Sequence, residues 1–145
     1  MNPHQYYASL LAIDTNNAKN VPFSVLNGDL SYINVLDAMN AWHLVQELSL
    51  VFSNNANNSN NSNNVFAASF KHTSPAGVAM ASTSLEAYCK ARDCDPLCSF
   101  GDFIAISHTV DEETAEYIKT EVSDGIIAPD YTPKALEILK EKKNI

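Results

Sequence analysis

The chain has 145 residues, of which 46% are hydrophobic and 18% are charged, a composition typical of one soluble globular domain. The formal net charge of −8 and the lack of a basic stripe argue against a protein that binds nucleic acid or an anionic membrane surface. No apolar run approaches the roughly eighteen residues of a membrane span, and no signal-peptide pattern is recognisable. We therefore expect a cytosolic protein that contacts neither nucleic acid nor membrane.

The first half of the chain is predicted to contain one long helix. Residues 1–20 are polar and rich in turn formers, and residues 22–27 form a short β-prone run closed by Asn27-Gly28-Asp29. The apolar residues then keep helical spacing from an Asn34 N-cap to about Phe52.

A low-complexity tract follows this helix. Residues 54–64 comprise eight asparagines, two serines and one alanine. Such a segment cannot bury apolar surface, so we expect a disordered insertion at a surface connection between a helix and a strand. We expect it to have no part in any mechanism.

Strands and helices alternate through the rest of the chain. The expected strands are 65–70, 78–80, 103–107 and 126–128, with a Ser74-Pro75-Ala76-Gly77 turn after the first of them. The expected helices begin at Thr83 or Ser84, at an Asp111 cap that leads to a stop at Asp124-Gly125, and at Thr132-Pro133. This alternation predicts an α/β fold with a largely parallel sheet and helices on both faces.

The three cysteines lie within ten residues of one another. Cys89, Cys94 and Cys98 have the spacing C-x4-C-x3-C, which matches neither a zinc ribbon nor a zinc finger. We therefore expect free thiols in a reducing compartment and no metal site.

Lys71 and His72 stand side by side at the end of the predicted strand 65–70. In open α/β sheets ligands collect where strands end. A lysine there can stabilise a developing oxyanion, and a neutral imidazole can accept a proton. On spacing alone the alternative, a surface Lys-His pair at a strand exit, is the more frequent arrangement.

Five short strings occur in order along the chain, and together they identify a family: Met1-Asn2-Pro3-His4-Gln5, Lys71-His72-Thr73-Ser74-Pro75-Ala76-Gly77, Ser99-Phe100-Gly101-Asp102-Phe103, Ser123-Asp124-Gly125-Ile126-Ile127-Ala128-Pro129 and Lys142-Lys143-Asn144. They resemble the formyltransferase domain of the bifunctional AICAR transformylase/IMP cyclohydrolase family. The likeness covers nearly the whole chain apart from the asparagine tract. It implies that residues 1–145 correspond to the first half of that domain, in a three-layer α/β/α, cytidine-deaminase-like fold.

The resemblance implies an activity in purine (IMP) biosynthesis. The family enzyme transfers a formyl group from its co-substrate, 10-formyltetrahydrofolate, to the amino group of AICAR ribonucleotide, and it acts as a homodimer. By resemblance His72 is the proton acceptor and Lys71 stabilises the transition state, and both contact the substrate. The zinc-deaminase residues H-x-E and P-C-x-x-C are absent around His72 and Cys98, so no metal is expected.

Two further residues have both a structural and a functional interpretation. Gly101 could be a plain turn residue, and Asp124 a polar helix stop. The resemblance instead makes both of them substrate-binding residues, with Asp124 accepting hydrogen bonds from ribose hydroxyls. Asn2, Pro3, His4 and Gln5 match a motif whose arginine and tyrosine would precede Met1.

These observations leave two functional interpretations. In the first, the chain is a piece of an active transformylase. In the second, it is an inactive truncated fragment or pseudoenzyme that only binds nucleotide or a dimer partner. The cyclohydrolase domain and the second half of the transformylase domain have no counterpart in this sequence, which favours inactivity of the 145 residues alone.

Overall fold

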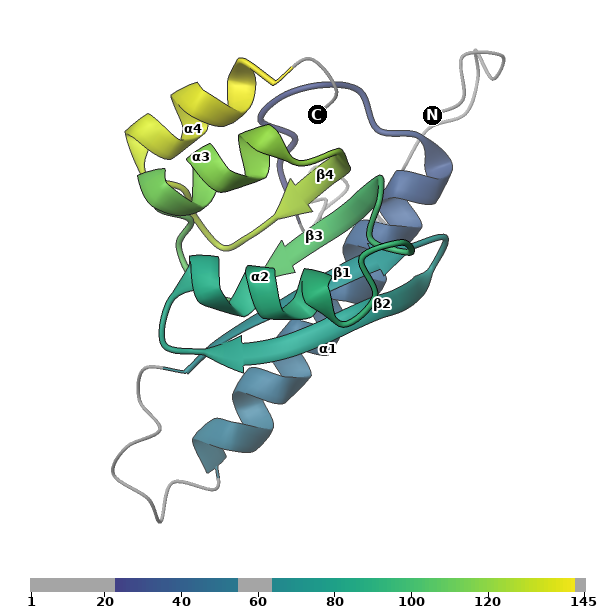
Figure 1. Ribbon diagram of the computed structural model, residues 1–145, viewed down its shortest axis with the longest axis vertical. Helices are drawn as coiled ribbons and strands as arrows, with labels where there is room; N and C mark the ends of the chain where they lie inside the picture. Colours follow the sequence, from purple (N-terminus) through teal and green to yellow (C-terminus); the bar gives the residue numbers. More distant parts are fainter. Residues whose placement is uncertain (1–22, 55–63, 143–145) are drawn as a thin grey trace, which may run out of the picture.

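A four-stranded mixed sheet forms the centre of the computed structural model, which describes residues 23–54 and 64–142 (Figure 1). The strands are β1 (Val65–Lys71), β2 (Ser74–Ala81), β3 (Asp102–Ile106) and β4 (Ser123–Ile127), and they lie in the order β2-β1-β3-β4. β1 is antiparallel to both β2 and β3, and only β3 and β4 are parallel. The predicted α/β class is confirmed, but the predicted largely parallel sheet is wrong.

The difference arises at the end of β1. We expected a turn at Ser74–Gly77 there, but these residues belong to β2, and the chain reverses through His72 and Thr73 alone. A two-residue connection can join only antiparallel strands, because a parallel neighbour requires a long crossover. β2 therefore pairs back onto β1 along its whole length.

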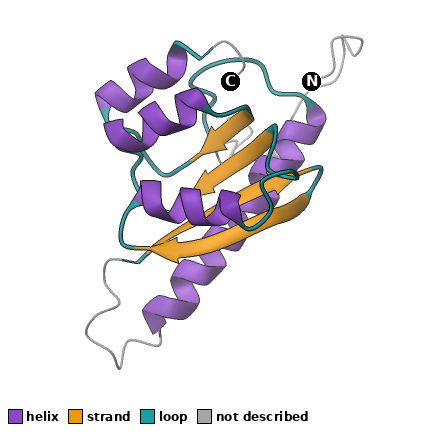
Figure 2. Ribbon diagram, viewed as in Figure 1, coloured by secondary structure: helices purple, strands orange, loops and turns teal. Residues whose placement is uncertain are grey.

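Helices cover both faces of the sheet (Figure 2). α1 (Tyr32–Asn54) packs on one face, where Ala38, Ala41 and Val45 meet Phe66 and Phe103 in a buried cluster. On the other face lie α2 (Ser84–Asp93), α3 (Glu112–Thr120) and α4 (Pro133–Lys140). Their apolar residues enclose the second core cluster together with β1 and β3.

Three of the four helix starts are confirmed. The side chains of Thr83, Asp111 and Thr132 accept hydrogen bonds from backbone amides three residues further on, at 3.1, 2.9 and 3.2 Å. These caps need only local partners, which explains why the sequence predicts them well.

The start of α1 differs from the prediction. Asn34 is not the N-cap, because the helix begins at Tyr32 and Ser31 precedes it. The Asn34 amide donates to Ser31 Oγ (3.2 Å), and Asn34 Oδ1 accepts from the Ser31 amide (3.1 Å). This is the reciprocal arrangement of a capping box, with Asn34 in the place of the usual glutamate or glutamine.

Two other expectations concern the segments around α1. Residues 23–27, the described part of the predicted β-prone run 22–27, form no strand. The asparagine tract does fall between a helix and a strand, although its residues 55–63 lie outside the described part of the chain.

No helix among the described residues is long and apolar enough to span a membrane.

The close packing of β2 against α2 depends on Gly77. A Cβ placed on this residue would lie 2.0 Å from the Ala91 carbonyl oxygen and 2.6 Å from Cys94 Cβ. We expect Gly77→Ala to lower the free energy of unfolding by about 1–3 kcal/mol or more, because the overlap involves backbone that must move. Urea denaturation measures this loss. Ser74→Ala, at an exposed position of the same strand, is the matched control, and equal stability of the two variants would contradict the prediction.

Candidate functional site

Three of the four predicted site residues meet at one end of the sheet. A Cβ placed on Gly101 would lie 3.8 Å from Lys71 Nζ and 3.8 Å from Asp124 Oδ1. An ammonium group, a carboxylate and a stretch of backbone without a side chain therefore surround the same small space. We call Lys71, Gly101 and Asp124 the sheet-end cluster.

The topology explains why residues so far apart in the sequence converge. β1 runs antiparallel to β3, so the end of β1 at Lys71 lies beside the beginning of β3. Gly101 immediately precedes β3, and Asp124 is the second residue of β4. The cluster is thus at the amino-terminal ends of the parallel pair, whereas ligands of open parallel sheets collect at the carboxyl ends, the place we expected from sequence.

Lys71 is the last residue of β1, as predicted, and its side chain is partly buried. Its ammonium group donates a hydrogen bond to the Phe100 carbonyl oxygen, which fixes the side chain beside Gly101. An ammonium group has three N–H donors, and the Phe100 carbonyl oxygen is the one hydrogen-bond acceptor of the Lys71 ammonium group among residues 23–54 and 64–142.

The structure places Gly101 in the turn that immediately precedes β3. Its φ is 72°, a left-handed conformation that favours glycine. Its amide donates to the Val122 carbonyl oxygen at 2.9 Å, and this bond ties the turn before β3 to the segment that enters β4. The backbone of Gly101 is thereby held next to Asp124.

Asp124 does not end a helix, so that part of the prediction is wrong. α3 ends at Thr120, and Asp124 lies in β4. The register passes from Asp102↔Ser123 to Phe103↔Gly125, which leaves Asp124 as the extra residue of a β-bulge. Bulges redirect side chains and are frequent beside functional sites. The bulge explains how a strand residue is exposed at the sheet-end cluster.

His72 is exposed at the hairpin turn, one residue beyond Lys71. His72 and Thr73 have φ values of 52° and 68°, so both adopt left-handed conformations that residues with a Cβ rarely occupy. For the β-branched Thr73 this conformation is strained. Asp37 of α1, only 4% exposed, compensates by accepting a hydrogen bond from the Thr73 amide through Oδ1.

This clamp gives a testable prediction for the turn. We expect Asp37→Ala to lower the free energy of unfolding by about 1–3 kcal/mol. The Thr73 amide loses its side-chain hydrogen-bond acceptor, and the buried space that the Asp37 side chain fills becomes empty. Adding Thr73→Gly should recover part of the loss, since glycine adopts the turn conformation without strain. Thermal unfolding measures both effects, and Asp29→Ala, at an exposed position before α1, is the control. Equal melting temperatures for the Asp37 and Asp29 variants would show that the clamp has no stabilising role.

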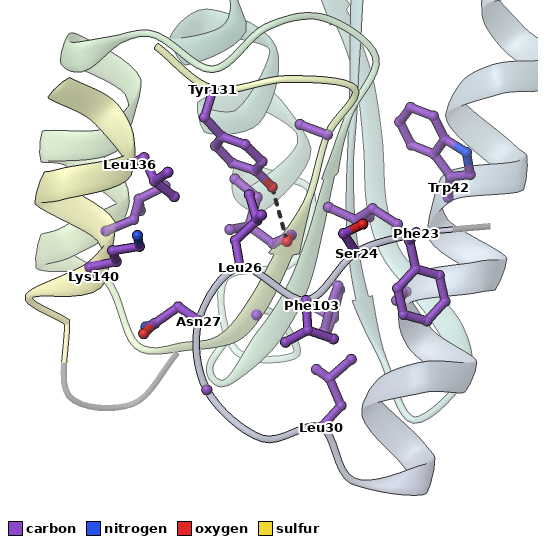
Figure 3. A pocket seen from close by; sticks show the side chains of 18 of the residues that line it. Phe23, Ser24, Leu26, Asn27, Leu30, Trp42, Phe103, Tyr131, Leu136 and Lys140 are labelled. Atoms are coloured by element: carbon purple, nitrogen blue, oxygen red, sulfur yellow. Dashed lines mark hydrogen bonds between the residues drawn. The ribbon is translucent and has the colours of Figure 1, made fainter. Parts of the chain in front are cut away.

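A cavity of about 510 Å³ adjoins the sheet-end cluster (Figure 3). It lies between the irregular segment 23–30, α1, β4 and α4, and Asp124 is one of its lining residues. Aromatic and aliphatic side chains dominate it, among them Leu26, Trp42 and Tyr131. The Tyr131 hydroxyl donates to the Ile126 carbonyl oxygen at 3.1 Å, so its ring is fixed within the wall. Sequence reasoning missed this cavity because it treated residues 22–27 as a β-prone run, whereas residues 23–30 form an irregular segment that lines the cavity.

The metal-binding potential of the described residues is low. They contain no group of three or more His, Cys, Asp or Glu side chains that could hold a metal ion. Cys89 is half-buried, Cys94 and Cys98 are exposed, and all three are free thiols. Asn2, Pro3, His4 and Gln5 lie outside the described residues.

Comparison with known proteins places these features in a family. All of residues 1–145 match the family described as the AICARFT/IMPCHase bienzyme. The bifunctional purine biosynthesis protein PurH of Clostridium botulinum (strain Hall) is 39% identical over 148 aligned residues, which cover 99% of this chain and 26% of that protein. PurH of Petrotoga mobilis (strain DSM 10674) gives the same identity and coverage. The chain thus spans about a quarter of the length of these relatives. On the match over its whole length, the chain belongs to the AICARFT/IMPCHase bienzyme family.

Proposed function

We propose that the chain contributes to formyl transfer from 10-formyltetrahydrofolate to the amino group of AICAR ribonucleotide. The observation that carries the proposal is the convergence of Lys71, Gly101 and Asp124 at one end of the sheet. Family membership and the PurH relatives support the same reaction. The reaction would belong to cytosolic purine biosynthesis.

The chemistry explains why a cation and a base are needed. The amino group of AICAR is conjugated to the imidazole and its carboxamide, so it is a poor nucleophile. Its attack on the formyl carbon forms a tetrahedral oxyanion while the nitrogen loses a proton. Collapse of this intermediate breaks the bond between the formyl carbon and N10 of the folate, which takes up a proton and leaves as tetrahydrofolate. In our proposal Lys71 stabilises the oxyanion through the N–H donors that Phe100 leaves unused, and His72 accepts the proton.

Gly101 and Asp124 bind the nucleotide in this proposal. The Gly101 backbone presents no side chain toward the space that Lys71 and Asp124 border, so a ligand can approach it closely. The exposed carboxylate of Asp124 accepts hydrogen bonds from the ribose hydroxyls. The neighbouring cavity, which Asp124 also lines, supplies apolar surface from side chains such as Trp42 and Tyr131.

The rest of the proposal is supported by family membership. Residues 1–145 would be the first half of the transformylase domain, in the three-layer, cytidine-deaminase-like fold, and the full-length enzyme would be a homodimer with a folate-binding second half. A binding-only role is the second candidate, and the observation that favours it is that the chain spans 26% of its PurH relatives. In that case the chain binds nucleotide or a partner subunit without turnover.

Nucleotide binding to the 145-residue chain tests the site. We expect titration calorimetry to detect binding of AICAR ribonucleotide to the chain. Lys71→Met should lower the affinity about tenfold or more, because a charged contact of this kind contributes about 1.5–3 kcal/mol. Asp124→Asn should weaken binding as well. Lys90→Met is the matched control, since Lys90 is an exposed lysine on α2 paired with Glu86. Equal affinities for the Lys71 and Lys90 variants would refute the proposed site.

A further inference from the structure

A buried polar network lies directly behind Lys71. Its centre is Asp102, the first residue of β3, which is fully buried together with Ser69 and Ser99. The Ser69 hydroxyl donates to Asp102 Oδ2 at 2.7 Å and lies 3.0 Å from Ser99 Oγ. The Tyr88 hydroxyl donates to the same carboxylate oxygen at 3.2 Å. None of these four side chains has a place in the proposed reaction.

The network holds both partners of the hydrogen bond that fixes Lys71. On the donor side, Ser69 precedes Lys71 by two residues in β1, so their side chains leave the same face of the strand. On the acceptor side, Ser99 directly precedes Phe100, whose carbonyl oxygen accepts from the Lys71 ammonium group. The contacts of Ser69 with Asp102 and Ser99 therefore join the strand that carries Lys71 to the turn that receives it.

Arg92 of α2 reinforces the acceptor side. Its Nη1 donates to the Ser99 carbonyl oxygen at 2.8 Å and lies 3.5 Å from Asp102 Oδ1. Ser99 Oγ donates in return to the Arg92 carbonyl oxygen at 3.2 Å. Ser99 is thus held through both its backbone and its side chain, and the position of the next carbonyl group, that of Phe100, is restricted.

The composition of the network suits positioning better than stability. Burial raises the pKa of the Asp102 carboxyl, although the Ser69 hydroxyl and the Arg92 charge oppose the change. A buried ionised carboxylate is costly, and well-packed apolar residues often match or exceed a buried ion pair in stability. The charged network provides directional hydrogen bonds to Ser69 and Ser99, which apolar residues cannot provide.

We infer that Asp102 is a positioning residue for Lys71, acting through Ser69 and through the turn that contains Ser99 and Phe100. Its function is to fix the Lys71 ammonium group beside Gly101 and Asp124 before a ligand binds. The consequence for binding rests on the proposed function of the sheet-end cluster, whereas the consequence for Lys71 itself does not.

The matched pair of variants is Ser69→Ala and Ser84→Ala. Both serines are buried, and each substitution removes one hydroxyl and no apolar surface. Ser84 Oγ donates to the Thr109 carbonyl oxygen, away from Lys71 and its partners. A loss of stability common to both variants is therefore separable from an effect specific to Lys71.

The first measurement observes Lys71 directly. In the 145-residue chain labelled with ¹³C-lysine, the Lys71 Cε–Hε signal is assigned by its disappearance in Lys71→Arg. We expect two resolved Hε shifts in the wild-type chain and in Ser84→Ala, and collapse toward free-lysine values in Ser69→Ala and Asp102→Asn. An unchanged Lys71 signal in both network variants, with their fold intact by circular dichroism, would overturn the inference.

The second measurement is the affinity for AICAR ribonucleotide. We expect Ser69→Ala to weaken binding about three- to tenfold and Ser84→Ala to leave it unchanged, since one hydrogen bond contributes about 0.5–1.5 kcal/mol. If Lys71→Met weakens binding but Ser69→Ala and Asp102→Asn do not, the inference fails and the proposed site stands. If the nucleotide does not bind, or binds equally to Lys71→Met, the proposed site fails, and the lysine signal still decides whether Asp102 positions Lys71.

Discussion

On the proposed function, replacing His72 with alanine in an active transformylase that includes residues 1–145 should slow formyl transfer about 10²–10⁴-fold, the usual contribution of a general base. Nucleotide binding should fall much less, because Lys71, Gly101 and Asp124 make the contacts on which binding depends in our proposal. Release of tetrahydrofolate measures the rate, and titration calorimetry measures the affinity.

The hairpin turn makes a second variant necessary. Alanine at a φ of 52° is strained, so His72→Ala could slow the reaction by displacing the turn rather than by removing the base. Asparagine tolerates left-handed conformations and lacks a basic nitrogen, so His72→Asn keeps the turn and removes the imidazole. Both variants should lose a similar factor.

The control is His108→Ala, which removes an exposed histidine that contacts only its neighbour Ser107 among the described interactions. Its rate should equal that of the parent enzyme. If His72→Asn reacts within a few-fold of the parent, His72 is not the base and serves only as part of the turn that follows Lys71.

The local features of the fold were predictable because they depend on few residues. Thr83, Asp111 and Thr132 cap helices through bonds to amides three residues away, and the surrounding sequence contains everything that such a cap requires. The antiparallel pairing of β1 with β2 was not predictable in this way. His72-Thr73 lacks the glycine and asparagine that mark two-residue hairpins, and the turn is held by Asp37, which is distant in the sequence.

The family motifs identify the candidate site residues, but only the fold explains how these residues are arranged. The family motifs pointed to Lys71, Gly101 and Asp124, but their convergence follows from the antiparallel pairing of β1 with β3. Asp102 and Ser69 were missed altogether. A signal for them does exist, because each is a polar residue within a buried strand, and such residues need hydrogen-bonding partners inside the protein.

Arg92→Met should destabilise the fold more than Gly77→Ala or Asp37→Ala, with a loss of about 3–5 kcal/mol in the free energy of unfolding at neutral pH. The Arg92 side chain is only 11% exposed, and its guanidinium group bridges Glu121 (2.7 Å) and Asp102 (3.5 Å). Methionine can fill much of the space but leaves Asp102 as a buried carboxylate without a cation. Urea denaturation at pH 7 measures the loss.

The pH dependence identifies the cause. Burial already raises the pKa of Asp102, and removal of the Arg92 charge, which lowers that pKa, will raise it further. A carboxyl whose pKa is higher in the folded than in the unfolded state favours folding below its unfolded pKa, and this contribution is lost as the pH rises through the folded pKa. The deficit of Arg92→Met should therefore be largest at neutral pH and shrink as the pH falls toward protonation of Asp102.

Two controls separate the possible origins of the deficit. Glu121→Gln removes the outer partner of Arg92, which is 25% exposed, and should cost far less than Arg92→Met. Arg92→Met combined with Asp102→Asn should recover much of the lost stability at pH 7, because no buried charge is left unpaired. If the double variant is as unstable as Arg92→Met, and if the deficit of the single variant does not change with pH, the loss comes from packing around Arg92 rather than from the charge of Asp102.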